Sequence, residues 1–378
     1  MKGAVLPPGK TIGIFGGGQL GRMMALAARP LGYRVHVLDP DPDCAARPVV
    51  EKVITAPFDD VDAARTLAKG VDVVTLEIEK IGLAALTAAA EHAPCRPDAT
   101  ILETIQDRAL QKRWLKGHAI PIGPYMEAAT PAQLKRAAEQ LGGRCFAKAA
   151  HGGYDGRGQM ELASADEAVA AWDELKAESV VCEFALDLDK EISVLVARSA
   201  GGEIAVYPVA HNHHEKRILA WSVIPAEIPE ELATKAQDLA RGIADGLKIV
   251  GLLAVEMFLT KTGELLVNEL APRPHNSYHA SDSACVTSQF EQVIRAVCGL
   301  PLGSVATVRP SAIANILGDA WEKGEPKFER ALAIPNLKLS LYGKQPKPGR
   351  KMGHLTASAE TSEDAVAVVR RGLNGLRG

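Results

Sequence analysis

The stretch Lys148-Ala-Ala-His-Gly-Gly-Tyr-Asp-Gly-Arg-Gly-Gln159 gives the strongest indication of how this chain folds. It follows the apolar run Cys145-Phe-Ala and leads into Met160-Glu-Leu, so the pattern predicts a strand, a glycine-rich loop and a second strand. The glycines permit positive φ and let the backbone approach a bulky anion. Backbone N–H groups in such a turn, together with Lys148 and Arg157, predict a loop that holds the phosphates of a nucleotide. An ordinary glycine-rich turn is the alternative.

Composition limits the classes of function that the chain can have. Its 378 residues predict two or three domains, and a net charge of −3 offers no basic field for nucleic acid or an anionic membrane. The six cysteines lie far apart without a CxxC pair, which favours reduced thiols over disulfides or zinc. The N-terminus lacks the pattern of a signal peptide, and no apolar run reaches the roughly 18 residues of a membrane span. We therefore expect a cytoplasmic enzyme.

The first hundred residues alternate between predicted strands and helices. We expect strands at 11–15, 34–39, 53–55 and 71–76, and helices at 20–31, 61–69 and 83–91. This alternation predicts a parallel, doubly wound, Rossmann-like sheet. Glu77 and Glu79 directly follow the fourth strand, at the edge where open α/β sheets bind ligands. Their position at the strand end favours contact of Glu79 or Glu77 with a substrate hydroxyl or amine; two solvated acids in a loop are the alternative.

The turn Gly16-Gly-Gly-Gln-Leu-Gly21 lies at the same edge of the predicted sheet. With Asp39 at the end of the second strand, its spacing fits the dinucleotide-binding fingerprint. The same glycines also suit a helix N-terminus that binds a ligand phosphate, or tight packing alone. We favour these two interpretations over a nicotinamide cofactor, because an isolated GxGxxG pattern is weakly specific.

The pattern changes near residue 100, where we place a domain boundary. Helices are predicted around 106–114, 132–141 and 165–176, and strands at 180–184, 190–197 and 204–209. The run His211-Asn-His-His214 is interpreted as a polar turn near a ligand. Zinc is the weaker alternative, because no cysteine or paired histidine motif accompanies these residues.

A predicted hairpin at 252–270 carries two acids. With a four-residue turn Lys261-Thr-Gly-Glu264, position 260 pairs with 265 and Glu256 faces Glu269. Opposed carboxylates in apolar surroundings destabilise a sheet unless a cation neutralises them. Mg²⁺ fits, since it binds one or two carboxylates plus phosphate oxygens, and Asn268 can add an oxygen. The alternative is a register shifted by one residue, with Glu256 exposed.

The segment Ala271-Pro-Arg-Pro-His-Asn-Ser277 follows the hairpin, and two prolines stiffen it. Its convergent donors favour binding of an anion or substrate. A helix at 289–298 ends at Gly299-Leu-Pro301, a second boundary; strands near 312–317, 337–341 and 354–358 and a helix at 362–372 follow. The basic loop 342–353 either is solvated or holds a substrate phosphate.

These features together resemble the ATP-grasp superfamily: a lysine-bearing strand, a glycine-rich loop and an acidic hairpin, with no Walker A sequence. Within it, the chain resembles the N5-carboxyaminoimidazole ribonucleotide synthetases of purine biosynthesis over nearly its whole length. The runs that carry the resemblance are Gly16-Gly-Gly-Gln-Leu-Gly-Arg-Met23, Gly152-Gly-Tyr-Asp-Gly-Arg-Gly-Gln159, Asn268-Glu-Leu-Ala-Pro-Arg-Pro-His-Asn-Ser277, Thr287-Ser-Gln-Phe-Glu-Gln292 and Gly349-Arg-Lys-Met-Gly-His354. The sequence departs from the family pattern at Lys80-Ile-Gly82 and Tyr278-His-Ala280.

The resemblance implies a fold and a reaction. The expected α/β fold has a Rossmann-like domain at 1–103, an ATP-grasp α+β domain at 104–302 and a small, mostly β domain at 303–378. The implied enzyme is a homodimeric ligase that uses ATP and Mg²⁺, for which Mn²⁺ can substitute. ATP phosphorylates bicarbonate to carboxyphosphate, and the amine of 5-aminoimidazole ribonucleotide then captures the carboxyl group. Carboxyphosphate is short-lived in water, so the glycine-rich loop is expected to exclude water.

The resemblance also implies roles for individual residues. Those expected to bind ATP are Arg108, Lys148, Gly153, Tyr154, Asp155, Gly156, Arg157, Gly158, Gln159, Glu183, Phe184, Ala185, Leu186, Glu191, His214, Asn268 and Glu269. Those expected to bind the ribonucleotide and bicarbonate are Gln19, Leu20, Glu79, Tyr154, Asp155, Arg273, His275, Asn276, Ser277, Lys344, Arg350 and Lys351. Glu256 and Glu269 are the expected Mg²⁺ ligands, and Arg273, His275, Asp155 and Lys344 the expected catalytic residues.

Three other functions stay open at this point. One is a related ATP-grasp ligase that activates formate for glycinamide ribonucleotide. The second is an NAD-dependent oxidoreductase built on Gly16–Gly21, and the third is a nucleotide-binding sensor without turnover.

Overall fold

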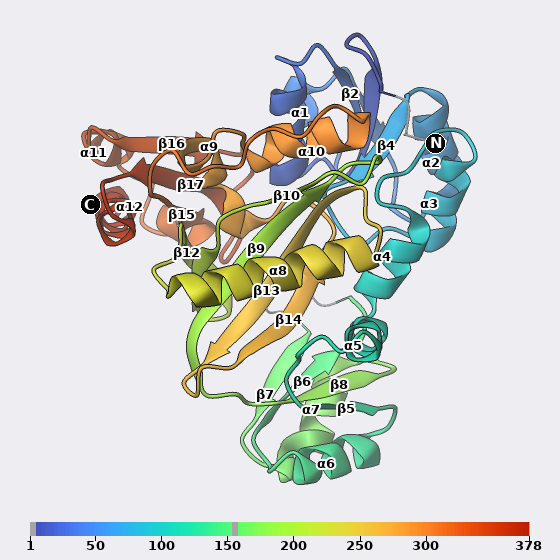
Figure 1. Ribbon diagram of the computed structural model, residues 1–378, viewed down its shortest axis with the longest axis vertical. Coiled ribbons are helices and arrows are strands. Elements are labelled where there is room, and N and C mark those ends of the chain that lie inside the picture. The colour runs from blue at the N-terminus through green and yellow to red at the C-terminus, as the bar shows by residue number, and fades with distance from the viewer. Residues whose placement is uncertain (1–4, 153–157, 378) are drawn as a thin grey trace.

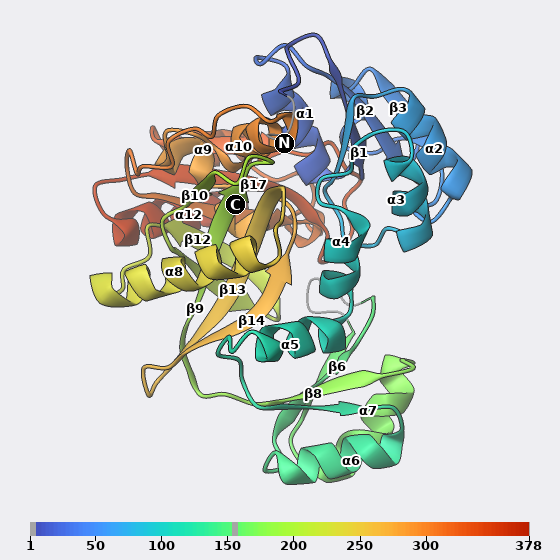
Figure 2. The ribbon, with the colours of Figure 1, turned by 45° about the vertical axis from the view of Figure 1, so that its right-hand side comes forward.

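The computed structural model describes residues 5–152 and 158–377. Within these residues the strands form three sheets, which Figure 1 and Figure 2 show from two sides. A four-stranded parallel sheet has the order β3-β2-β1-β4, a nine-stranded sheet forms the centre, and a second four-stranded sheet has the order β5-β8-β6-β7. The expected α/β fold is confirmed.

The N-terminal sheet is the predicted doubly wound unit. Its strands are β1 (Thr11–Phe15), β2 (Arg34–Asp39), β3 (Lys52–Thr55) and β4 (Val73–Leu76), and its helices are α1 (Gln19–Ala28), α2 (Val61–Lys69) and α3 (Leu83–Ala90). Helix α1 stops three residues before the predicted end, ahead of Pro30, which has no N–H to donate to the helix.

The helix predicted around 106–114 is two helices, α4 (Ala99–Gln106) and α5 (Arg108–Gly117). Asp107 between them is extended, and its carboxylate accepts hydrogen bonds from the N–H groups of Ala109 and Leu110 at 2.7 and 3.1 Å. This N-cap starts a new helix, because it satisfies donors that the first turn leaves without partners. Arg108 is thereby fixed at the start of α5.

The small antiparallel sheet carries the lysine strand. It consists of β5 (Tyr125–Ala128), β6 (Cys145–Ala149), β7 (Gln159–Leu162) and β8 (Val180–Phe184). Helices α6 (Pro131–Gln140) and α7 (Ala168–Leu175) cover one face with an apolar core that includes Cys145 and Cys182. Since side chains alternate along a strand, Lys148 and Glu183 project from the opposite face.

The nine-stranded sheet spans both the central and the C-terminal region. Its strands are β9 (Leu188–Arg198), β10 (Ile204–Val206), β11 (Ala210–Glu215), β12 (Ile218–Ile224), β13 (Gly251–Thr260), β14 (Leu265–Ala271), β15 (Ser311–Leu317), β16 (Leu337–Leu341) and β17 (Lys351–Ser358). Strand β12 pairs directly with β15, with Trp221 opposite Ala314. The C-terminal strands therefore continue the central sheet, and helix α12 (Ser362–Leu376) packs on β15 and β17.

Two predictions for this region are wrong. His211–His214 is not a turn but part of β11, because the side chain of Asn212 is buried and hydrogen-bonded to Ser193 and Ser222. The strand predicted at 204–209 ends at Val206, ahead of Pro208, which has no N–H to donate. Strand β12 and the long helix α8 (Glu230–Gly246) were not predicted.

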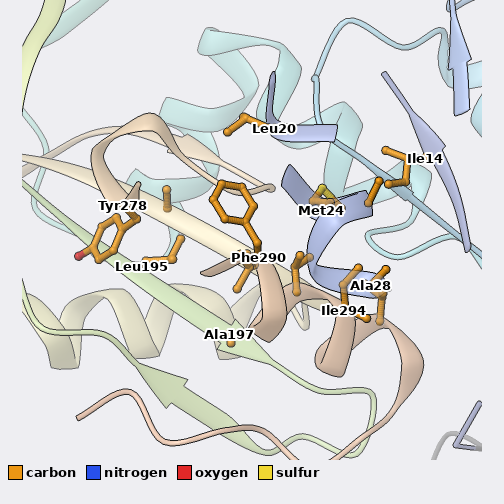
Figure 3. Close-up of a cluster of buried hydrophobic side chains, with 14 of the residues drawn as sticks. Ile14, Leu20, Met24, Ala28, Leu195, Ala197, Tyr278, Phe290 and Ile294 are labelled. Atoms are coloured by element: carbon orange, nitrogen blue, oxygen red, sulfur yellow. The ribbon is translucent and has the colours of Figure 1, made fainter. Parts of the chain in front are cut away.

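The faces of β13 explain how the domains are joined. Leu253 and Val255 pack in the cluster beneath α8, whereas Leu252 and Ala254 pack on the other side. There the cluster includes helix α10 (Gln289–Cys298) and continues into α1, where Met24 and Ala28 lie near Phe290 and Ile294 (Figure 3). This apolar contact fixes the carboxyl edge of the parallel sheet against the central sheet.

Short helices complete the described chain: α9 (Ser281–Ala284), α11 (Phe328–Leu332) and the 3₁₀ turns at 47–49, 165–167, 276–278 and 318–321. The helix predicted at 165–176 is the second of these turns followed by α7. Across residues 5–152 and 158–377, no helix combines the length and the apolar character that crossing a bilayer requires.

Candidate active site

A cavity of about 1300 Å³ lies between the three sheets. The N-terminal unit contributes Gln19 of α1 and Glu79 beyond β4 to its lining, the small sheet Lys148, the central sheet Glu256, and the C-terminal loop Arg350. All five come from the set of residues predicted to bind ligands. The fold thus brings together side chains that are more than three hundred residues apart in the sequence.

The glycine turn after β1 is filled by protein carboxylates. Glu77 accepts hydrogen bonds from the N–H groups of Gly18 at 2.6 Å and Gly21 at 2.8 Å, and Asp39 accepts one from Gly17 at 2.7 Å. A Cβ on Gly16 would lie 2.4 Å from Cγ of Glu77, so the glycine is required by this packing. The donors that a dinucleotide pyrophosphate would need are occupied, which argues against the nicotinamide hypothesis and against Glu77 as a substrate ligand.

One end of the cavity is where the predicted substrate residues meet. Arg273 Nε lies 2.8 Å from Glu79 Oε1. Lys344 of the C-terminal loop donates to Gln19 at the start of α1. Gln106 supports the Glu79 segment by donating to the carbonyl oxygens of Glu79 and Ile81. The cations Arg273 and Lys344 are therefore held by Glu79 and Gln19 at the edge of the parallel sheet.

The other end of the cavity has a buried charge cluster around Glu183. Lys148 Nζ lies 2.8 Å from one carboxylate oxygen and Lys112 Nζ lies 3.4 Å from the other. Burial alone would raise the pKa of Glu183, but the two lysines outweigh it and lower that pKa to about 2. Lys148 also lies 3.5 Å from the amide oxygen of Asn268. The carboxylate of Glu183 thus holds Lys148 at the cavity wall.

Lys112 was not among the predicted site residues. It is 3% exposed, and its Nζ donates to the carbonyl oxygen of Asn268 at 3.2 Å. The available signal was its spacing from Arg108, because residues four apart share one face of a helix. Arg108 donates to the carbonyl oxygen of Ala149 at 2.9 Å, so both side chains of α5 reach the lysine strand or the acidic hairpin.

The acidic hairpin has the predicted pair in a different register. Glu256 is opposite Glu269, as expected, but Leu259 rather than Thr260 pairs with Leu265. The turn is one residue longer on the β13 side, and a bulge between Glu256 and Met257 restores the pairing. The alternative with Glu256 facing solvent is wrong. The extra residue on the bulged strand is Asn268, which is thereby aimed near Lys148.

Charge crowding surrounds Glu256. Its carboxylate lies 3.2 Å from His275 Nε2, and His214 Nδ1 lies 3.0 Å from Glu191 on the neighbouring strand. Burial raises the pKa of Glu256 to about 7, with Glu269 and Glu191 adding to the increase and His214 opposing it. Burial alone would lower the pKa of His214, but Glu191 outweighs it and raises that pKa above its usual value.

Replacing Glu256 with Gln is expected to raise the free energy of unfolding of ligand-free protein at pH 8 and to change it little at pH 5. Because folding raises this pKa from 4.5 to about 7, the favourable contribution of the carboxyl is complete below pH 4.5 and is lost as the pH rises through 7. Gln keeps the uncharged form throughout, so the gain at pH 8 is on the order of 3 kcal/mol. Urea unfolding without nucleotide or divalent cation measures it; equal changes at both pH values would contradict the buried-acid interpretation.

The segment 271–277, with its two prolines, is held in place by Gln289 of helix α10. His275 donates its N–H to Gln289 Oε1 at 2.8 Å, and Gln289 Nε2 donates to the carbonyl oxygen of His275 at 2.9 Å. The ring atom Nδ1 lies 2.7 Å from Ser277 Oγ, which also contacts Ser193 Oγ at 3.0 Å. Ser277 is fully buried, so the structure favours it as a support for His275 over the predicted substrate contact.

The remaining predicted residues divide into three groups. Those that line the cavity are Leu20, Gln159, Phe184, Leu186, Glu191, His214, Asn268, Glu269, His275, Asn276 and Lys351. Ala185 is buried behind its neighbours, and Gly158 takes a φ of 70° at the start of β7. Gly153, Tyr154, Asp155, Gly156 and Arg157 lie outside the described residues.

Comparison with known families identifies the class. The ATP-grasp domain family matches residues 113–290, the ribonucleotide synthetase preATP-grasp family matches 9–106, and the phosphoribosylaminoimidazole carboxylase C-terminal domain family matches 311–367. The chain is therefore an ATP-grasp ligase. It is 42% identical over 368 residues to the N5-carboxyaminoimidazole ribonucleotide synthase of Bacillus subtilis, covering 96% of this chain and 95% of that protein. The chain belongs to the N5-carboxyaminoimidazole ribonucleotide synthase family.

Further relatives agree. The synthase of Brucella melitensis is 41% identical over 354 residues, covering 93% of this chain and 97% of that protein. A solved ADP complex of an N5-carboxyaminoimidazole ribonucleotide synthetase has a TM-score of 0.91 and 41% identity, over 98% of each chain. The synthase of Aspergillus clavatus in complex with ADP and 5-aminoimidazole ribonucleotide has a TM-score of 0.91 and 33% identity, over 97% of this chain and 98% of that one.

Proposed function

We propose that this enzyme joins bicarbonate to the exocyclic amine of 5-aminoimidazole ribonucleotide, with hydrolysis of ATP to ADP and phosphate supplying the driving force. The observation that carries the proposal is the single cavity, in which Lys148 and the acids Glu256 and Glu269 line one region and Arg273 and Lys344 another. The first set suits a nucleotide triphosphate and the second suits a phosphorylated, anionic substrate. Membership of the synthase family supports the same pairing of substrates.

In this proposal the small sheet binds the nucleotide. Lys148, fixed by Glu183, and Arg108, fixed by the carbonyl of Ala149, neutralise the phosphates. Phe184, with 40% of its surface exposed, and Leu186 offer an apolar surface for the base at the cavity wall. Glu191 also lines the cavity, and its carboxylate can accept a hydrogen bond from a ribose hydroxyl. His214 holds that carboxylate in place.

The two opposed acids fit a divalent cation. Glu256 and Glu269 are directly opposite on paired strands, and their mutual repulsion contributes to the raised pKa of Glu256. Two carboxylates together with phosphate oxygens make the ligand set that Mg²⁺ prefers, and Mn²⁺ accepts the same set. When bound, such an ion would neutralise charge that develops on the phosphates. Asn268, on the bulge beside Glu269, contributes a further oxygen nearby.

The carboxyl transfer then proceeds in two steps. A bicarbonate oxygen attacks the terminal phosphorus of ATP and ADP leaves, which gives carboxyphosphate. The ribonucleotide amine attacks the carboxyl carbon, the C–O bond to phosphate breaks, and the amine loses a proton. Arg273, oriented by Glu79, stabilises the anionic carboxyphosphate, and His275, held between Glu256 and Ser277, receives the proton. Positioning of the reactants accounts for most of the acceleration.

The ribonucleotide phosphate is assigned to the cationic end of the cavity. Lys344, Arg350 and Lys351 come from the C-terminal loop and strand β17, and Lys344 reaches Gln19 across the cavity. This assignment favours the phosphate-binding interpretation of the basic loop over a solvated one. The homodimer, the cytoplasmic location and the boundaries near residues 103 and 302 stay predictions; the six free cysteines agree with a reducing compartment.

The test is substrate-dependent release of ADP. We expect 5-aminoimidazole ribonucleotide plus bicarbonate to stimulate ADP formation well above the level with ATP alone, whereas glycinamide ribonucleotide plus formate is expected to have no effect. Labelled bicarbonate should appear in an acid-labile product in a one-to-one ratio with ADP. ADP release that is indifferent to the aminoimidazole substrate would contradict the proposal.

A further inference from the structure

The turn between β11 and β12 has an unusual backbone for its sequence. Lys216 and Arg217 both have positive φ, at 50° and 67°. They form the only pair of consecutive non-glycine residues with positive φ among residues 5–152 and 158–377. A two-residue hairpin loop of this kind normally contains Asn-Gly, because a side chain with a Cβ is disfavoured in the left-handed region. The sequence therefore keeps two strained residues where a glycine would fit better.

Arg217 makes a contact that a glycine would not make. Its Nη1 donates to the carbonyl oxygen of Gln159 at 3.0 Å. Gln159 is the first residue of β7 and pairs with Lys148 on β6. The hydrogen bond therefore runs from the central sheet to the small sheet, and both of its residues line the cavity. It ends on the strand pair that carries the phosphate-binding lysine.

Lys216 provides an internal comparison. It shares the positive φ and the exposure of Arg217, but it does not line the cavity. If the two charged residues served only to form the exposed turn, neither would be expected to contact another sheet. Only the second residue reaches across to β7, which separates the backbone strain from the contact it permits. Strain of this kind persists where surrounding structure or function requires it.

We propose that Arg217 is a positioning residue for the nucleotide, tying strand β7 to the central sheet so that Lys148 keeps its place beside Asn268 of the acidic hairpin. The inference rests on the proposed function, since it assumes that the phosphates lie beside Lys148. Arg217 also adds a positive charge to the cavity lining at the junction of the two sheets. Its long, planar guanidinium can hold the carbonyl of Gln159 with one N–H and leave others for a phosphate oxygen.

Three variants test this proposal: R217G, K216G as the matched control, and R217K. Both glycine variants relieve backbone strain, so K216G is expected to raise the thermal unfolding midpoint, and R217G to raise it less because it also loses the hydrogen bond to Gln159. R217G alone is expected to raise the Kd for ADP and the KM for ATP by about tenfold, the size of one hydrogen bond to a charged group, with the KM for the aminoimidazole substrate changing less than twofold. R217K, which keeps one donor, is expected to recover part of the affinity.

The possible outcomes distinguish the role of Arg217 from the proposed function of the enzyme. Wild-type protein that fails to bind ADP would overturn the proposed function itself. Tight ADP binding by wild type together with unchanged binding by R217G would overturn only the role of Arg217, as would an equal loss in K216G. A variant R217G that fails to fold, with R217K as stable as wild type, would contradict the strain that the proposal assumes.

Discussion

Replacing Glu269 with Gln is expected to reduce turnover by about 100- to 1000-fold, the scale seen when one group that stabilises transition-state charge is lost. Glu269 faces Glu256 across the hairpin and lies 3.8 Å from Arg108. The substitution keeps the shape of the side chain but removes the negative charge that a divalent cation requires. Because it also removes repulsion with Glu256, the folded state should be at least as stable as that of wild type.

The matched control is Glu264→Gln, in the turn of the same hairpin. Glu264 is exposed, and its carboxylate accepts a hydrogen bond from Thr262 of the same turn at 3.0 Å. It is expected to leave turnover within twofold of wild type. Steady-state ADP release, together with thermal unfolding of each variant, distinguishes loss of chemistry from loss of fold. Near-normal turnover in the Glu269 variant would remove the basis for a cation between the two acids.

Replacing Glu183 with Gln is expected to lower the free energy of unfolding at pH 7 by about 3 kcal/mol, because breaking a buried ion pair leaves uncompensated charge. Two lysines depend on this carboxylate, and Lys112 is buried so deeply that desolvation lowers its own pKa. Lys148 also loses its anchor, so ATP binding should weaken together with stability. Chemical denaturation at pH 7 and ADP titration measure the two effects.

The difference between wild type and this variant should depend on pH in a defined direction. Folding lowers the pKa of Glu183 from 4.5 to about 2. Its contribution to stability is therefore complete above pH 4.5 and is lost as the pH falls through 2. Since a protonated Glu resembles Gln, the two unfolding free energies should converge over that interval. A gap that stays constant between pH 5 and pH 2.5 would be inconsistent with an ionic role.

The control for Glu183 lies in the same sheet, two strands away on β7. Glu161 pairs with Arg144 at 2.9 Å, but both side chains are exposed. Exposed ion pairs contribute little, so Glu161→Gln should change the free energy of unfolding by less than about 0.5 kcal/mol. If Glu183→Gln destabilises the protein and Glu161→Gln does not, the loss of stability is due to the burial of Glu183 and not simply to removal of a carboxylate from the small sheet.

The sequence was sufficient to predict that Glu77 and Glu79 lie at the carboxyl edge of the parallel sheet. It was insufficient to predict which group each carboxylate contacts. Strand-end position correctly brought Glu77 and Glu79 to the glycine turn, yet Glu77 binds the amides of that turn while Glu79 pairs with Arg273. Both carboxylates follow the same strand, and only the tertiary approach of other segments distinguishes them. Local pattern contains no information on that approach.

The pairing of the two hairpin acids was predicted correctly, although the register of the hairpin turn was not. Glu256 and Glu269 were predicted as opposite even though the assumed turn was one residue too short, because a bulge at Asn268 compensated. Bulges are set by side-chain packing on both faces, which a hairpin rule does not consider. The histidines of β11 were misassigned because polar residues suggest a turn, whereas Asn212 obtains its partners from adjacent strands in the folded state.

The pairing of β12 with β15 has a consequence for how this protein tolerates rearrangement. Because β15 is hydrogen-bonded to β12 along its length, the C-terminal strands cannot be removed without exposing the edge of β12. Removing everything after residue 302 would leave the unpaired N–H and C=O groups of β12 open to other chains, and intermolecular strand addition would follow. Recombination with related ligases should therefore succeed at the loops between the parallel sheet and α5, and fail at residue 302, because that junction separates β12 from β15.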